Sequence, residues 1–291
     1  MKRLTIFTPT YNRAYILPKL YESLCVQTCQ DFEWLVVDDG STDNTRELVD
    51  GWIKDGKIAI RYCIQENGGK MRAYNKAVSL TDSELFVCID SDDQMASERV
   101  VEDSLMFWDE HKDDACHKPI GGMVSVRKSL HGRHDLSAAP AMGRLRELGS
   151  YYGGETTIFI LTEILRNYPY PSFEGEKFVT DVYIYDQMDE AYLFLFHPYV
   201  SQNCVYQQDG YTLSYRRLLF SNPKGHREYH ALQMRLKKGG LKSVICYISL
   251  SLFVRDHTMF TNSPDLSKTI LLYPVGCLKY MYDRYMLWKE K

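Results

Sequence analysis

The sequence predicts an α/β fold with a mostly parallel central sheet, flanking helices and a helical C-terminal extension. Two observations predict the sheet. Short apolar segments alternate four times with segments of helical periodicity over the first ~100 residues, a pattern typical of parallel strands joined by right-handed crossovers. Two of these apolar segments also run without a break into aspartates, as buried strands do where they leave a sheet.

The individual elements of this first part follow from local patterns. Apolar runs predict strands at residues 4–8, 32–37, 58–64 and 85–89. Helices are expected at residues 15–27, 44–52, 71–79 and 97–108. In the first of these helices Ile16, Leu20 and Leu24 recur at helical spacing, and Ser41 and Thr45 are candidate N-caps for the second.

Patterns in the rest of the chain are weaker. A strand is expected at residues 120–126, and a strand or turn with a short helix is expected before Pro169. Further strands are expected at residues 192–196 and 200–206. Helical periodicity predicts helices at residues 182–188, 226–238, 241–253 and 267–288.

The polar loops of the first part point to a ligand site. The loops at residues 9–13, 38–43 and 90–93 all leave the carboxyl ends of predicted parallel strands, which is the edge where open α/β sheets bind ligands. Asp90, Asp92 and Asp93 would raise each other's pKa there unless a cation such as Mg²⁺ or Mn²⁺ lay among them. The alternative reading is a solvated acidic turn, or a cap for the helix near Glu98.

Several other classes are disfavoured. A net charge of −3 argues against nucleic-acid binding, and the eight cysteines lack the spacing of a zinc site. The sequence contains neither Gly-x-Gly-x-x-Gly nor a Walker motif, so an ordinary dinucleotide or P-loop site is not expected. No stretch reaches the ~18 apolar residues of a membrane span, and the N-terminus does not read as a signal peptide. We therefore expect a reduced, cytoplasmic protein.

Four segments in order, TPTYNR, FEWLVVDDGSTDNT, ENGGKMRAYNKAV and FVCIDSDD, resemble the family 2 glycosyltransferases of the GT-A fold, a Rossmann-like fold of nucleotide-diphospho-sugar transferases. The resemblance implies that the nucleotide sugar contacts Thr8, Pro9, Tyr11, Asp39, Lys70, Asp90 and Asp92, and that Asp92 and Asp93 bind the metal. An aspartate can accept a hydrogen bond from the imino N–H of uracil, which suits Asp39. Lys70 could pair with phosphate or hold Asp92, or it is a solvated lysine.

The resemblance also implies a catalytic base at the start of the helix near residue 182. Asp181 fits that place best, and Glu174 and Glu176 are its rivals, because the family's usual Glu-Asp pair is absent. The alternative reading of Asp181 is an aspartate stabilised by the helix dipole. Residues 207–214 resemble a turn that closes over the diphosphate in the family. Arg216 or Arg217 could pair with phosphate or lie on a solvated face.

The resemblance implies two domains, a GT-A domain at residues 1–220 and a helical extension at residues 221–291. Residues 1–100 would bind the nucleotide and residues 101–220 the acceptor. The implied activity is inverting, metal-dependent transfer from a UDP-sugar to a saccharide or lipid-linked saccharide, in cell-surface polysaccharide synthesis, with Mn²⁺ or Mg²⁺ as cofactor.

Basic and aromatic residues interleave in the extension, which could be an interfacial surface at the inner membrane face or could simply pack on the core. Two other functions remain open. A nucleotidyltransferase would need a Gly-rich basic loop near the N-terminus, which TPTYNR does not supply. A non-catalytic nucleotide-sugar or glycan-binding protein would not need three clustered carboxylates.

Overall fold

The computed structural model describes residues 2–114, 116–128, 139–152, 156–204 and 215–289. The chain divides into two compact units. The first, which we call the sheet unit, consists of Met1–Tyr170 and Ile184–Gly210, and the second, the helical unit, consists of Pro171–Tyr183 and Tyr211–Lys291. The helical unit thus includes a segment that precedes the last strand. The domain boundary after residue 220 stays a prediction.

Within the described residues, nine strands form one sheet in the order β3-β2-β1-β4-β8-β6-β9-β5, with β7 paired to β9. The strands are β1 (Leu4–Thr10), β2 (Phe32–Asp38), β3 (Ile60–Ile64), β4 (Leu85–Cys88), β5 (Gln94–Met95), β6 (Ile120–Lys128), β7 (Met142–Gly143), β8 (Thr156–Leu161) and β9 (Leu193–Asn203). The helices of the sheet unit are α1 (Leu17–Cys25), α2 (Thr45–Asp55), α3 (Lys70–Leu80), α4 (Val100–His111), α5 (Leu145–Tyr152) and α6 (Thr162–Leu165).

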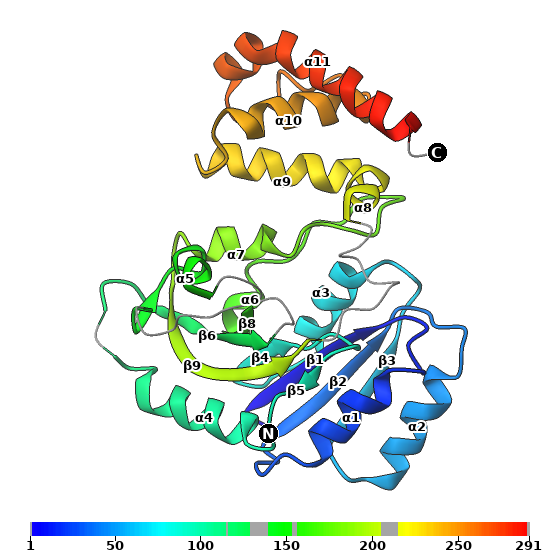
Figure 1. The fold of residues 1–291 in the computed structure, drawn as a ribbon, viewed down its shortest axis with the longest axis vertical. Helices are drawn as coiled ribbons and strands as arrows, with labels where there is room; N and C mark the ends of the chain where they lie inside the picture. The colour runs from blue at the N-terminus through cyan, green and yellow to red at the C-terminus, as the bar shows by residue number, and fades with distance from the viewer. Residues whose placement is uncertain (1, 115, 129–138, 153–155, 205–214, 290–291) are drawn as a thin grey trace. The chain divides into compact units, whose positions relative to one another are not determined.

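The α/β fold class is confirmed, but the orientation of the strands changes halfway across the sheet. Strands β1 to β4 are parallel neighbours, as the strand–helix alternation predicts (Figure 1). Beyond β4, strand β8 pairs antiparallel with both β4 and β6, while β6 and β9 are parallel. The sheet as a whole is therefore mixed rather than mostly parallel, because strands that are not joined by a single helical crossover are free to pair in either direction.

Strand β9 replaces the two short strands expected at residues 192–196 and 200–206. It runs continuously along β6, with register shifts between Ser125 and Val126 and between Val126 and Arg127. Irregularities of this kind bend a strand without ending it. The polar residues in the middle of this segment therefore mark a bend and not a turn.

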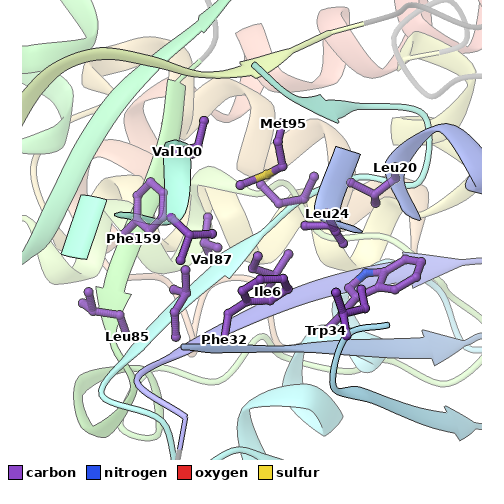
Figure 2. Packing of buried hydrophobic residues seen from close by; sticks show 14 of the residues in the cluster. Ile6, Leu20, Leu24, Phe32, Trp34, Leu85, Val87, Met95, Val100 and Phe159 are labelled. Carbon is purple, nitrogen blue, oxygen red and sulfur yellow. The ribbon is translucent and has the colours of Figure 1, made fainter. Parts of the chain in front are cut away.

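The sheet is covered on both faces. Alternate residues of β1 point to opposite faces of the sheet. Leu4 and Ile6 belong to a core that includes residues of α1, α2 and α4. On the other face, Phe7 contacts Tyr74 of α3 and stacks on Phe86. Figure 2 shows the first of these cores, in which Ile6, Trp34 and Val87 pack with Leu20 and Leu24 of α1. Because both faces are covered, a ligand would reach this part of the sheet at the carboxyl ends of β1, β2 and β4, where the polar loops follow.

The helical unit contains α8 (Tyr215–Ser221), α9 (Pro223–Arg235), α10 (Gly240–Phe253) and α11 (Leu266–Lys289), and α7 (Val182–Met188) begins in it. Its core comprises residues of α9 and α10 together with Met259. Helix α11 approaches α10 closely at Gly276, where a Cβ atom would lie 2.3 Å from Cγ2 of Ile248. In the described part of the chain, no helix combines the length and the apolar character that crossing a bilayer requires.

Candidate functional site

Asn12 joins the loops that follow β1 and β2. Its Oδ1 accepts hydrogen bonds from the backbone N–H of Thr42 at 2.7 Å and of Asp43 at 3.3 Å, and its own N–H donates to Ser41 Oγ at 2.8 Å. Asn12 has a φ of 54°, a left-handed conformation that asparagine tolerates better than most residues. The two loops therefore meet at one edge of the sheet, as predicted. Sequence reasoning quoted Asn12 within TPTYNR but gave it no role.

The three predicted residues of the first loop differ in exposure. Thr8 is fully buried and its Oγ1 accepts a hydrogen bond from Trp34 Nε1 at 2.9 Å. Pro9 is half-buried, and Tyr11 is 48% exposed. The Thr8 side chain thus supports the strands beneath the edge, and Tyr11 is the member of the trio whose ring is open to a ligand.

Asp39 holds the turn that leads into α3. Its Oδ1 accepts from Gln65 Nε2 at 2.7 Å and from the Gly68 N–H at 2.8 Å, and its Oδ2 accepts from the Gly69 N–H at 2.7 Å. Gly69 has a φ of 90°, which only glycine adopts without strain. A carboxylate has about four acceptor positions. One position on Oδ2 therefore remains for a ligand, and pairing of Asp39 with a base stays a prediction.

Lys70 and Asp90 form an ion pair across the candidate site. Lys70 begins α3, and its Nζ lies 2.8 Å from Oδ1 and 3.2 Å from Oδ2 of Asp90, just beyond β4. Burial by itself would raise the pKa of Asp90, but the cations of Lys70 and Arg127 hold this pKa below its usual value. Lys70 thus holds Asp90, whereas the sequence suggested Asp92 as its carboxylate partner.

Asp93 is bound to an arginine that sequence reasoning missed. Its side chain is 4% exposed, and its Oδ2 accepts a hydrogen bond from Nη2 of Arg127 on β6. Arg127 Nε also donates to Cys204 Sγ at 3.0 Å. Burial raises the pKa of Asp93 to about 7, and this rise is opposed by Arg127 and assisted by Asp90 and Asp92. Local sequence carries no signal for this pair, because its members are 34 residues apart.

Asp92 differs from both of its acidic neighbours. In the part of the chain that the structure describes, its carboxylate has no hydrogen bond or ion pair with another residue. Burial raises its pKa, and the negative charge of Asp90 raises it further. Asp92 is therefore the carboxylate of this loop that is not already engaged by a cationic side chain within the described residues, and an added cation would favour its ionised form.

The acidic loop is suited to a metal ion that takes most of its ligands from the phosphates of a substrate and from water. Across the described ranges, no group of three or more His, Cys, Asp or Glu residues is arranged to hold a metal ion. Asp90 and Asp93 are engaged by Lys70 and Arg127, which leaves Asp92 as the open ligand. Mg²⁺ commonly binds through one or two carboxylates and takes its remaining ligands from phosphates and water. The residues present fit that mode, and a direct role for Asp93 stays a prediction.

The three carboxylates considered for the base lie in the helical unit. Asp181 is exposed and immediately precedes α7, so its place at a helix start agrees with the sequence. Glu174 is also exposed. Glu176 is 8% exposed and accepts the backbone N–H of Lys224 on Oε1 and that of Gly225 on Oε2, each at 2.8 Å. Glu176 therefore caps the N-terminus of α9, and Asp181 as the base stays a prediction.

We expect Glu176→Ala to lower the free energy of unfolding of the helical unit by about 2 kcal/mol, because two N–H groups at the start of α9 lose their acceptor. Urea unfolding followed by far-UV circular dichroism measures this loss. Glu174→Ala, at an exposed position two residues away, is the matched control and should change stability by less than about 0.5 kcal/mol. Equal effects of the two substitutions would contradict the capping role.

Two predicted features fall outside what the structure describes. The turn at residues 207–214 and the side chain of Arg216 are not among the described parts. Arg217 is exposed in α8.

Comparisons with known proteins show which family this chain resembles. A family model described as "Glycosyl transferase family 2" matches residues 5–163. The chain is 38% identical over 98 residues to a teichoic acid poly(glycerol phosphate) polymerase of Staphylococcus epidermidis, covering 33% of this chain and 14% of that protein. It is 31% identical over 135 residues to the poly(ribitol-phosphate) beta-N-acetylglucosaminyltransferase TarS of Staphylococcus aureus, covering 46% of this chain and 22% of that protein. The chain thus spans less than a quarter of the length of either relative.

Solved structures show the same fold. The crystal structure of S. aureus TarS 1–349 in complex with UDP-GlcNAc matches with a TM-score of 0.61 and 22% identity, over 90% of this chain and 74% of that one. A mannosyltransferase of Pyrobaculum calidifontis in complex with GDP-Man and Mn²⁺ matches with a TM-score of 0.56 and 17% identity, over 98% of this chain and 82% of that one. At these sequence identities, the two matches show that the fold is shared and nothing more.

Proposed function

The chain belongs to glycosyl transferase family 2, and on this premise we propose that it transfers a sugar from a nucleotide-diphosphate donor to a saccharide hydroxyl with inversion at the anomeric carbon. The observation that carries the proposal is the acidic loop at the carboxyl end of β4, where Asp92 is left open beside the paired Asp90 and Asp93. A UDP-sugar is the proposed donor, since the structure of TarS that this chain resembles was solved with UDP-GlcNAc.

In this proposal the loops after β1 and β2 bind the nucleoside. Tyr11, half-exposed at the edge, would cover the base, and the remaining acceptor position on Asp39 Oδ2 would take the imino N–H of uracil. Thr8 and Pro9 would set the position of the loop that carries Tyr11. Asp90, held by Lys70, would accept a ribose hydroxyl, and Lys70 lies close enough to this carboxylate to contact a phosphate as well.

We propose that Asp92 binds a divalent cation, Mn²⁺ or Mg²⁺, and that Asp93 assists it. Such an ion supplies positive charge to the departing diphosphate. The Mn²⁺ in the structurally similar mannosyltransferase supports a divalent metal. Asp93 would bind directly only if its ion pair with Arg127 opened. With that pair intact, Arg127 and Asp93 would hold the acidic loop in place.

We propose that Asp181 accepts the proton of the attacking hydroxyl. It is exposed and lies beside the first turn of α7, whereas its rival Glu176 is buried and caps the N-terminus of α9. A carboxylate is a weak base at neutral pH, so proton transfer would be concerted with departure of the diphosphate.

The proposed acceptor is a saccharide or lipid-linked saccharide of a cell-surface polymer, since one relative is named for a teichoic acid poly(glycerol phosphate) and the other for a poly(ribitol-phosphate). Contact with the inner membrane face is proposed through α11, where Leu271 and Trp288 are 76% and 73% exposed and Lys268 and Arg284 also occur. Co-sedimentation with anionic liposomes tests this contact, and absence of binding would contradict it.

Calorimetry of UDP binding, with and without Mn²⁺, tests the donor site. We expect micromolar binding that weakens at least tenfold without the metal, because the acidic loop and the diphosphate repel each other. Release of UDP after incubation with UDP-sugars and saccharide acceptors then tests transfer. A protein that binds none of UDP, GDP and dTDP would contradict the proposed function, and one that binds UDP but never releases it from a donor would be a binding protein.

A further inference from the structure

A cavity of ≈ 730 Å³ lies within the helical unit, lined by residues of α8, α9, α10 and α11 together with Thr180. Every residue of this lining belongs to the helical unit, so the cavity is complete within one compact unit. Small-molecule sites in proteins commonly have volumes of about 300–1,000 Å³. The proposed sugar transfer makes no use of this space.

The walls of the cavity are largely apolar. They are formed by Leu219, Phe220, Tyr229, Ile245 and Tyr282. Phe220 is held by a neighbouring ring, since its centroid lies 5.7 Å from that of Phe253. Apolar walls of this kind favour a ligand with a hydrocarbon or aromatic body, because such a body leaves water when it binds.

One ion pair in the lining is neutral by itself. Lys279 Nζ lies 2.9 Å from Oδ1 and 2.8 Å from Oδ2 of Asp283. Asp283 is 3% exposed and also accepts a hydrogen bond from Ser249 Oγ at 2.9 Å. These contacts satisfy the buried carboxylate, so the pair does not call for a charged ligand.

Two histidines of α9 add polar groups without adding charge. His226 Nε2 and His230 Nε2 are 3.1 Å apart, and His230 Nδ1 lies 3.3 Å from Ser243 Oγ. Burial lowers the pKa of His226 to about 4 and that of His230 to about 3, with nearby lysines assisting, so both rings are neutral at pH 7. Nδ1 of His226 is buried and has no hydrogen-bond partner in the described part of the chain. The two rings thus add neutral polar surface to the lining.

The lining of the cavity has a net positive charge, which comes from Lys242. This lysine is exposed on α10 and forms no ion pair among the described residues. Lys279 and Asp283 cancel each other and both histidines are neutral, so the charge of Lys242 is the one left unbalanced. A ligand that complements this lining carries an anionic group on an apolar body.

We propose that this cavity binds an amphipathic anion, a molecule with an alkyl or aromatic body and one terminal phosphate, sulfonate or carboxylate group. The body lies against Phe220, Tyr229 and Ile245, and the anionic group pairs with Lys242. Such a ligand can be a free molecule or a lipid with a single anionic head group.

Titration calorimetry of the full chain with decyl phosphate, below its critical micelle concentration, tests the charge requirement. We expect one bound equivalent, and about tenfold weaker binding to Lys242→Gln, because the ion pair with the head group is lost. Lys54→Gln is the matched control, since Lys54 is exposed in the last turn of α2 in the sheet unit and does not line the cavity. Decanol, which lacks the charge, should bind the wild type at least tenfold more weakly than decyl phosphate.

A second pair of variants tests the cavity itself. Ile245→Trp places a large ring in the space and should abolish binding of decyl phosphate, with a circular dichroism spectrum like that of the wild type. Ile53→Trp, on the exposed side of α2 and outside the lining, should leave binding unchanged. No binding to the wild type, equal losses with the two lysine variants, or full binding to a folded Ile245→Trp would overturn the proposal.

Competition identifies the source of the ligand. Displacement of decyl phosphate by phosphatidylglycerol vesicles would assign the cavity to a membrane lipid, and undiminished binding in their presence would assign it to a free amphiphile. All of these measurements omit nucleotide sugar. They can therefore fail while sugar transfer is confirmed, or succeed while it is not.

Discussion

Asp92→Asn should lower kcat/KM for sugar transfer by about 10²–10³-fold, because the site loses several kcal/mol of stabilisation of the departing diphosphate. Asp92 is the residue to substitute because its two acidic neighbours already form ion pairs, Asp90 with Lys70 and Asp93 with Arg127. Initial rates of UDP release over a range of Mn²⁺ concentrations measure the loss. The fold should survive, since the Asp92 carboxylate has no bond to another residue in the described structure.

Asp82→Asn is the matched control for this loss. The Asp82 side chain is 74% exposed and forms a surface ion pair with Arg166, so its replacement should leave the rate within about twofold of wild type. Near wild-type activity of Asp92→Asn would make the acidic loop an ordinary solvated turn. If excess Mn²⁺ restores the transfer rate of Asp92→Asn, the defect lies in metal binding.

Asp181→Asn should lower kcat by about 10²–10⁴-fold while the dissociation constant for UDP stays within about threefold, because a general base acts on the acceptor and not on the donor. The amide keeps the shape of the carboxylate but cannot accept the proton. Calorimetry gives donor binding, and UDP release with acceptor present gives the rate.

Glu174→Gln is the control for Asp181, as it changes a second exposed carboxylate of the same segment. If Glu174→Gln abolishes transfer and Asp181→Asn does not, the base is Glu174. Equal losses of donor binding and rate in Asp181→Asn would show that this residue supports the structure of the site instead.

The buried ion pair of the acidic loop makes its two members poor choices for tests of catalysis. Asp93 is buried with Arg127, and removal of one member of a buried pair commonly costs 3–5 kcal/mol because the other charge is left uncompensated. Variants of Asp93 or Arg127 would therefore mix loss of stability with loss of activity. Asp92 and Asp181 give clearer tests, since one has no bond to another described residue and the other is exposed.

Much of the structure of the first ~100 residues could be predicted from sequence. Apolar runs and helical spacing predicted the first four strands and the helices between them, and the parallel order of β1 to β4 follows from these crossovers. Because parallel strands end at one edge, the convergence of their polar loops could also be predicted, and Asn12 shows two of the loops joined there. These inferences succeeded because each depends on residues close together in the chain.

The tertiary structure decided which groups pair within the site. Asp93 is bound to Arg127 on β6 and Lys70 to Asp90, while Asp39 is held by the Gly68–Gly69 turn. Glu176, a candidate base by position, caps α9 instead. Each of these contacts joins segments 20 to 49 residues apart. No local periodicity encodes such pairings. The Asp93–Arg127 pair depends on β6 joining the sheet, and the contacts of Glu176 depend on α9 packing against the segment before α7.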